Sequence, residues 1–225
     1  MEIKLLSKLS RDYVEQLLSG IPFFKLVKQQ DAWQFELLLQ ASRVITYVPG
    51  EVVLQRGDSD QWLFFLLKGR LAVYVDDPLK GELVNYVTPG EVFGDLAQLM
   101  GQPRTATVLA EQGFRESTVL ATDASIFGDI SSTRPITIQT KLAYYRNTVH
   151  NLRWKLEVYR SQHLQHQLAN KHRQVKLYTG VKDTIEELRA LHEQAQALAS
   201  LLLEWNREFG VLTEETSAPQ DLYHL

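Results

Sequence analysis

The spacing of apolar residues changes near residue 121, and this change constrains the fold more than any other feature of the chain. Between Arg43 and Ala121, short β-branched and apolar runs are separated by turn residues at roughly ten-residue spacing. Many short strands of this kind are typical of an antiparallel sandwich or barrel. One of the turns is Asp76-Asp77-Pro78. The predicted strands are 44–48, 52–54, 63–67, 71–75, 83–87, 107–110 and 117–121.

Helical spacing precedes this β-region. Leucines three and four positions apart predict a helix over residues 1–20, which Gly20 and Pro22 end. A second apolar pattern, between residues 23 and 38, predicts one or two further short helices. The predicted fold class is therefore α+β, with an antiparallel β-barrel or jelly roll and flanking helices over residues 21–134.

A heptad pattern follows Pro135. Neither Gly nor Pro occurs again until Gly180, and apolar residues alternate three and four positions apart. This spacing predicts a long helix over 135–176 with a coiled-coil seam, through which we expect a parallel homodimer. A weaker repeat predicts a second helix over 181–209. The seam residues are Leu142, Tyr145, Val149, Leu152 and Leu156.

Net charge divides the chain into three parts. Residues 1–134 carry a net charge of −4, residues 135–176 carry +7, and residues 177–225 carry −6. A basic helix can bind nucleic acid or an anionic membrane surface. It is neutralised within the chain if the acidic helix folds back antiparallel on it, and we favour this helical hairpin because it also covers both apolar seams. The region 135–212 is then a dimerisation and output region, followed by a polar, flexible tail at 213–225.

Composition excludes several classes of function. The chain has no cysteine, so disulfides, thiolate metal sites and cysteine nucleophiles are absent. Its apolar stretches are shorter than the ~20 residues of a membrane helix, and its N-terminus lacks the apolar core of a signal peptide, so we expect a cytoplasmic protein. All six histidines lie outside the β-region, which excludes a cupin-type metal centre. The sequence contains no catalytic triad motif or phosphate-binding loop of nucleotide triphosphatases, and it predicts neither an enzyme nor a metal site.

One stretch inside the β-region carries the residues of an anion site. Gly94 lets the backbone approach a ligand closely, and Asp95 is placed to cap a short helical turn whose free N–H groups attract anions. After Pro103, Arg104 offers a charged fork suited to phosphate oxygens. The residues alone leave two interpretations open, a phosphate-binding cradle and a surface turn with an arginine in solvent.

The same stretch resembles the phosphate-binding cassette of the cyclic nucleotide-binding domain family. This family includes the regulatory subunits of cyclic AMP-dependent kinase, cyclic GMP-dependent kinase, gated channels and the bacterial catabolite activator protein. The resemblance rests on Phe93-Gly94-Asp95-Leu96-Ala97 and Pro103-Arg104-Thr105-Ala106. It covers about residues 20–130, because four upstream segments also agree: Ile21-Pro22-Phe23-Phe24, Pro49-Gly50-Glu51, Gln55-Arg56-Gly57-Asp58 and Phe64-Phe65-Leu66-Leu67-Lys68-Gly69.

The resemblance implies a role for each residue of the cassette. Backbone N–H groups that bind the cyclic phosphate are implied at Gly94, Leu96 and Ala97. Arg104 would pair with the phosphate charge, and Thr105 and Ala106 would line the same pocket. The acidic residue, Asp95, would accept a hydrogen bond from the ribose 2′-hydroxyl. The family usually has Glu there, and Asp shortens the reach by roughly 1.5 Å, one C–C bond.

The C-terminal helices are implied to form the output of the domain. In bacterial members a long helix after the barrel forms the dimer and covers the base, and the residues here that would contact the base are Thr140, Tyr144 and Thr148. Those regulators continue into a winged helix-turn-helix, whereas residues 181–209 are helical throughout and free of Gly and Pro. DNA binding by that route is disfavoured, because a net charge of −6 over residues 177–225 repels phosphates.

The function that the resemblance implies is a cytoplasmic receptor for cyclic AMP or cyclic GMP. Binding would be transmitted through the long C-terminal helix to a partner protein, with no cofactor and neither an enzymatic nor a helix-turn-helix output. Two alternatives stay open. One is a ligand-free scaffolding dimer with a degenerate form of this fold, and the other is an atypical nucleic-acid-binding regulator that uses the basic helix.

Overall fold

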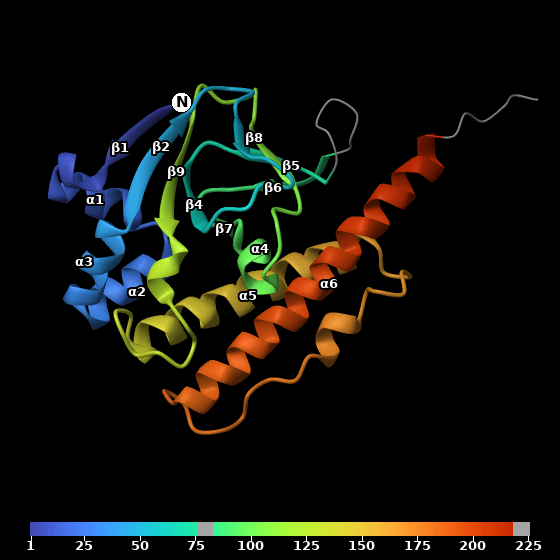
Figure 1. Ribbon diagram of the computed structural model, residues 1–225. Coiled ribbons are helices and arrows are strands. Elements are labelled where there is room, and N and C mark those ends of the chain that lie inside the picture. Colours follow the sequence, from blue (N-terminus) through green and yellow to red (C-terminus); the bar gives the residue numbers. More distant parts are fainter. Residues whose placement is uncertain (76–82, 218–225) are drawn as a thin grey trace, which may run out of the picture.

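The computed structural model of the protein describes residues 1–75 and 83–217 (Figure 1). The predicted turn Asp76-Asp77-Pro78 and residues 218–225 of the predicted tail lie outside the described residues. The helices and strands, in chain order, are β1 (Glu2–Leu5), η1 (Leu6–Lys8), α1 (Arg11–Leu18), α2 (Pro22–Gln30), α3 (Ala32–Gln40), β2 (Ser42–Tyr47), β3 (Val52–Leu54), β4 (Trp62–Lys68), β5 (Leu71–Tyr74), β6 (Leu83–Val87), β7 (Val92–Phe93), α4 (Asp95–Met100), β8 (Thr107–Ala110), β9 (Ser117–Asp123), η2 (Ala124–Phe127), α5 (Ile138–Gln162), η3 (Lys171–Gln174) and α6 (Ile185–Ser217).

The strands form two antiparallel sheets rather than the closed barrel that the strand spacing allowed. One sheet has the order β1-β2-β9-β4-β7 and the other has the order β3-β8-β5-β6. Inward-facing residues of both sheets share one core, which includes Ile45, Phe64, Leu71, Val108 and Val119. All seven predicted strands are present, and their bounds agree within two residues. The observed architecture is therefore an open two-sheet sandwich with flanking helices.

The N-terminal segment differs from the predicted helix over residues 1–20. Residues Glu2–Leu5 form strand β1, which pairs antiparallel with β2 so that Ile3 lies opposite Ile45. Helix α1 begins only at Arg11, after Ser10. The leucine spacing suggested one continuous helix, but the open edge of β2 offers backbone hydrogen bonds that the segment takes instead.

Helices α1 to α3 pack against the five-stranded sheet, and α2 and α3 contribute rings to an aromatic cluster there. Phe24 of α2 packs edge-on against Phe65 of β4, with ring centroids 5.2 Å apart. Tyr144 of α5 packs in the same way against Phe23, with centroids 5.9 Å apart. The first turns of α5 are therefore fixed to the helical side of the domain. No helix among residues 1–75 and 83–217 is long and apolar enough to cross a bilayer.

Helices α5 and α6 pack side by side and run in the same direction (Figure 1). Near their starts, Arg146 of α5 donates from Nη2 to Glu187 Oε2 of α6 at 2.6 Å. Near their ends, Tyr159 of α5 packs on Trp205 of α6, with centroids 5.9 Å apart. The acidic helix does pack on the basic one, but the predicted antiparallel hairpin is wrong, because the connection returns to the start of α5 before α6 begins.

The predicted long helix over 135–176 ends at Gln162. Residues 163–184, the return segment, then run back along α5 to the start of α6. Arg153 of α5 donates to the carbonyl oxygens of His172 and Val175, at 3.1 and 2.9 Å. Glu157 accepts hydrogen bonds from His172 Nε2 and from Arg173, which together lower the pKa of Glu157 to about 2. These contacts hold the return segment against the side of α5.

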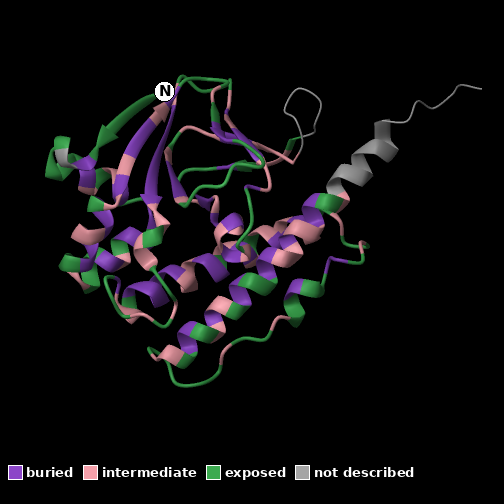
Figure 2. Ribbon diagram, in the orientation of Figure 1, coloured by how far each residue is buried: buried purple, intermediate pink, exposed green. Residues whose placement is uncertain are grey.

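The second predicted helix also has different bounds, since α6 runs over Ile185–Ser217 rather than 181–209. Residues 213–217, placed in the predicted tail, are helical. Most of the connection before α6 is exposed and is drawn green in Figure 2.

The heptad seam is buried inside the single chain. Leu142, Leu152 and Leu156 have no exposed surface, and they share a core with Leu188 and Leu198 of α6. The seam is therefore not available as the dimer interface that the heptad pattern predicted. The homodimer stays a prediction that has lost its predicted interface.

Candidate functional site

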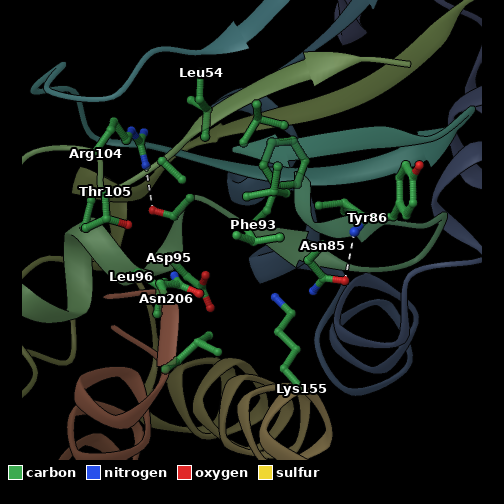
Figure 3. Close-up of a pocket in the computed structure, with 18 of the residues that line it drawn as sticks. Leu54, Asn85, Tyr86, Phe93, Asp95, Leu96, Arg104, Thr105, Lys155 and Asn206 are labelled. Atoms are coloured by element: carbon green, nitrogen blue, oxygen red, sulfur yellow. Dashed lines mark hydrogen bonds between the residues drawn. The ribbon is translucent and has the colours of Figure 1, made fainter. Parts of the chain in front are cut away.

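One cavity lies between the four-stranded sheet, the loop that carries α4, and helices α5 and α6 (Figure 3). Its volume is about 90 Å³, whereas small-molecule sites typically have about 300–1,000 Å³. The seven residues predicted to bind the cyclic phosphate and ribose all line it. They are Gly94, Asp95, Leu96, Ala97, Arg104, Thr105 and Ala106.

Gly94 joins strand β7 to helix α4 and has a backbone conformation that other residues rarely adopt. Its φ angle is +79°, and a Cβ atom at this position would lie 2.7 Å from Arg104 Nη1. Gly94, and not Asp95, is the N-cap residue of α4, and no side chain caps this helix. The first N–H groups of α4 have no backbone acceptor within the helix, and two of them, those of Asp95 and Leu96, point to the Asp95 carboxylate and favour its charged form.

Arg104 and Lys155 are cations that line the cavity. The side chain of Arg104 is held by a fixed set of acceptors. Nε donates to Asp60 Oδ2 at 3.1 Å, Nη2 donates to the other oxygen of the same carboxylate, and Nη1 donates to the carbonyl of Gly94 at 2.6 Å. Nη2 also donates to the carbonyl of Trp62 at 2.6 Å. Four of the five N–H groups of the guanidinium therefore have acceptors among the described residues, which leaves one Nη1–H for a ligand.

Asp60 is the counter-ion that the sequence pattern did not single out. Burial raises the pKa of Asp60, but hydrogen bonds from Arg104 and from the Trp62 N–H, together with the charge of Arg104, lower it overall. The signal for this residue was weak, because Asp60 stands in an acidic turn beside Asp58 and either carboxylate could face solvent.

Asp95 is buried at the base of the cavity with only 2% of its surface exposed. Its Oδ2 atom has no hydrogen-bond partner among the described residues. Burial raises the pKa of Asp95, and the charge of Lys155, the backbone N–H groups of Asp95 and Leu96 and the charge of Arg104 only partly oppose this effect. A buried acceptor without a donor is costly, and it is satisfied when a ligand hydroxyl occupies the cavity.

The predicted base contacts do not line the cavity. Thr140, Tyr144 and Thr148 are buried in the core of the domain, where Tyr144 packs on Phe127 with centroids 4.8 Å apart. The residues of α5 that do line the cavity are Lys155 and Tyr159, about three turns further along the helix. The C-terminal half of α5 lines the cavity and its first turns do not, because α6 and the return segment pack against α5 in this arrangement.

Helix α6 also contributes to the cavity, which sequence reasoning missed. Leu202 and Asn206 line it beside Lys155 and Tyr159. Leu202 and Trp205 are apolar residues within the weaker repeat of residues 181–209, and Asn206 follows Trp205 with no motif to distinguish it. Within the described parts of the chain, no group of three His, Asp or Glu residues could hold a metal ion.

Comparison with known proteins identifies the β-region. Residues 44–134 match the family model described as the cyclic nucleotide-binding domain. The chain is 30% identical over 105 residues to a cGMP-dependent protein kinase of Eimeria tenella, a match that covers 46% of this chain and 10% of the kinase. It is 26% identical over 103 residues to a cAMP-dependent protein kinase type II regulatory subunit of Drosophila melanogaster, covering 46% of this chain and 26% of that protein.

Among solved structures, one match is the N-terminal domain of a transcriptional regulator from Streptomyces coelicolor A3(2). The TM-score is 0.45 at 23% identity, and the match covers 62% of this chain and 94% of that one. The chain thus spans only about a tenth to a quarter of the curated relatives named above. Residues 44–134 thus match the cyclic nucleotide-binding domain family, over less than half of the chain.

Proposed function

We propose that this protein is a receptor for a 3′,5′-cyclic purine nucleotide, cyclic AMP or cyclic GMP, and that it has no enzymatic step of its own. The observation that carries the proposal is the gathering of all seven cassette residues, among them the buried Arg104, around one cavity. The relatives of this region, a cGMP-dependent protein kinase and a regulatory subunit of a cAMP-dependent protein kinase, support this class of ligand.

The cyclic phosphate is proposed to bind at the end of the cavity formed by Arg104 and α4. The remaining Nη1–H of Arg104 donates to one phosphate oxygen, and the backbone N–H groups of Leu96 and Ala97 donate to another. Thr105 and Ala106 line the same end. Asp95 Oδ2, which has no partner among the described residues, accepts the hydrogen bond of the ribose 2′-hydroxyl.

The narrow cavity supports a route for transmission. Leu202 and Asn206 of α6 line a space of about 90 Å³, so a nucleotide that fills it displaces α6 outward or selects an arrangement in which α6 has already moved. The helix extends beyond the domain to Ser217 (Figure 1). We propose that a partner protein reads this displacement of α6.

Binding is tested by isothermal titration calorimetry on protein stripped of nucleotide. We expect cyclic AMP or cyclic GMP to bind with one site per chain, and 5′-AMP, whose phosphate is not cyclic, to bind far more weakly. The absence of heat with both cyclic nucleotides would remove the proposed function.

Transmission is tested by the fluorescence of Trp205. This side chain lies on α6, packs on Tyr159 and His163, and is 1% exposed. We expect its emission to shift on addition of the nucleotide that binds, and Trp205→Phe to abolish the shift. An unchanged spectrum at saturating nucleotide would contradict movement of α6 while leaving binding intact.

A further inference from the structure

Asn206 of α6 has a buried hydrogen-bond acceptor without a partner. The residue is 8% exposed, and no described atom donates to its Oδ1. It lines the same cavity as Asp95, whose Oδ2 is the other unpartnered carboxylate or amide oxygen there. Buried polar atoms are nearly always paired, so an unpaired one that faces a cavity indicates a site that a ligand completes.

The position of Asn206 is fixed by its neighbours on α6. Trp205 packs on Tyr159 of α5, and Leu202 shares the core of α5 and α6. Closer to its start, α6 is held to α4, because Gln196 Nε2 donates to the carbonyl oxygen of Leu99 at 3.1 Å. Figure 3 shows Asn206 beside Asp95 and Leu96. The amide is therefore held next to the cassette.

The chemistry of the two oxygens restricts what each can bind. A carbonyl oxygen accepts hydrogen bonds and cannot donate them. A cyclic purine nucleotide has few donors: the ribose 2′-hydroxyl, the exocyclic amino group of the base and, in guanine, the ring N1–H. The cyclic phosphate has none. The proposed function assigns the 2′-hydroxyl to Asp95, so the donor left for Asn206 is on the base.

We infer that Asn206 Oδ1 accepts a hydrogen bond from the exocyclic amino group of the bound purine. This inference rests on the proposed function and extends it, because it makes α6 a part of the binding site that distinguishes one base from another. The bound nucleotide then joins α4, through phosphate and ribose, to α6, through the base.

The test uses two matched pairs of ligands on the full chain. Cyclic AMP is compared with the 3′,5′-cyclic monophosphate of purine riboside, which lacks only the 6-amino group. Cyclic GMP is compared with cyclic IMP, which lacks only the 2-amino group. For at least one pair, we expect the nucleotide with the amino group to bind about tenfold more tightly to the wild-type protein. Which pair shows the difference identifies the amino group.

Variants assign this preference to Asn206. We expect Asn206→Leu to bring the affinity ratio of that pair close to 1. The control is Gln194→Leu, which replaces another buried amide of the same helix outside the cavity, and we expect it to keep the ratio. A ratio near 1 for both pairs in the wild type overturns the inference, as does a ratio that survives Asn206→Leu or that is also lost in Gln194→Leu. Equal binding within each pair contradicts this inference alone, whereas no binding of any of the four ligands contradicts the proposed function as well.

Discussion

Arg104 and Asp60 form an ion pair with two hydrogen bonds at the wall of the cavity. The arginine side chain is 2% exposed, and the carboxylate side chain is 32% exposed. The pair fixes the guanidinium so that Nη1 lies against the carbonyl of Gly94, at the start of α4. A side chain that is held in this way loses little conformational entropy when it binds an anion.

Replacing the carboxylate should weaken both stability and binding. We expect Asp60→Asn to lower the free energy of unfolding by about 2 kcal/mol, because hydrogen bonds between charged groups are lost around a buried guanidinium. Urea denaturation measures this change. Asp58→Asn is the matched control, since Asp58 is exposed and two residues away. Equal stability of the two variants would show that the ion pair contributes nothing.

Gly94 should be less replaceable than Gly101, at the other end of α4. Both have positive φ angles, +79° and +60°, so alanine strains the backbone at either position. Only at Gly94 would the new Cβ meet another atom, Arg104 Nη1 at 2.7 Å, whereas nothing lies within 4 Å at Gly101. We expect about 1 kcal/mol of destabilisation for Gly101→Ala and clearly more for Gly94→Ala, together with weaker nucleotide binding. Indistinguishable denaturation midpoints would refute the close contact.

The buried carboxyl of Asp95 should make stability depend on pH. Burial raises its pKa in the folded protein above the unfolded value, which is about 3.9. The stability that this group contributes is complete below the unfolded pKa and is lost as the pH rises through the folded pKa. We therefore expect the free energy of unfolding of Asp95→Asn, relative to wild type, to increase between pH 3 and pH 7. A difference that does not change with pH would be inconsistent with the raised pKa.

Leu152 and Trp154 provide a test of the seam. Leu152 has no exposed surface and lies in the core between α5 and α6, whereas Trp154 is 63% exposed. We expect Leu152→Ala to lower the free energy of unfolding by about 3 kcal/mol without changing the mass measured by sedimentation. Trp154→Ala should change stability by less than about 0.5 kcal/mol. Dissociation of an oligomer on Leu152→Ala, without loss of stability, would restore the predicted dimer seam.

The sandwich and the cassette could be predicted from the sequence because their signals are local. Turn residues separate strands of alternating pattern, and Gly94, Asp95 and Arg104 stand close together in the chain. The arrangement of α5 and α6 could not be predicted in this way. A heptad seam specifies that Leu152 is buried, but it does not specify whether the partner is another chain or α6.

The direction of α6 depended on interactions that have no sequence signature. The contacts of Glu157 with His172 and Arg173 hold the return segment against α5, and so α6 starts again beside Arg146. Asn206 reaches the cavity only because of this parallel arrangement. For the same reason the predicted base contacts, including Tyr144, stayed in the core.

The most direct test of the account is calorimetry of the wild-type protein and Arg104→Gln, both stripped of nucleotide, with cyclic AMP and with cyclic GMP. The double variant Asp60→Asn/Arg104→Gln is measured beside them, because it leaves no unpaired carboxylate at the wall of the cavity. We predict that the wild type binds at least one of the two nucleotides, and that both variants bind it at least tenfold more weakly. Wild-type affinity in the variants, or no binding to the wild type, would contradict the assignment of this cavity as a cyclic nucleotide site.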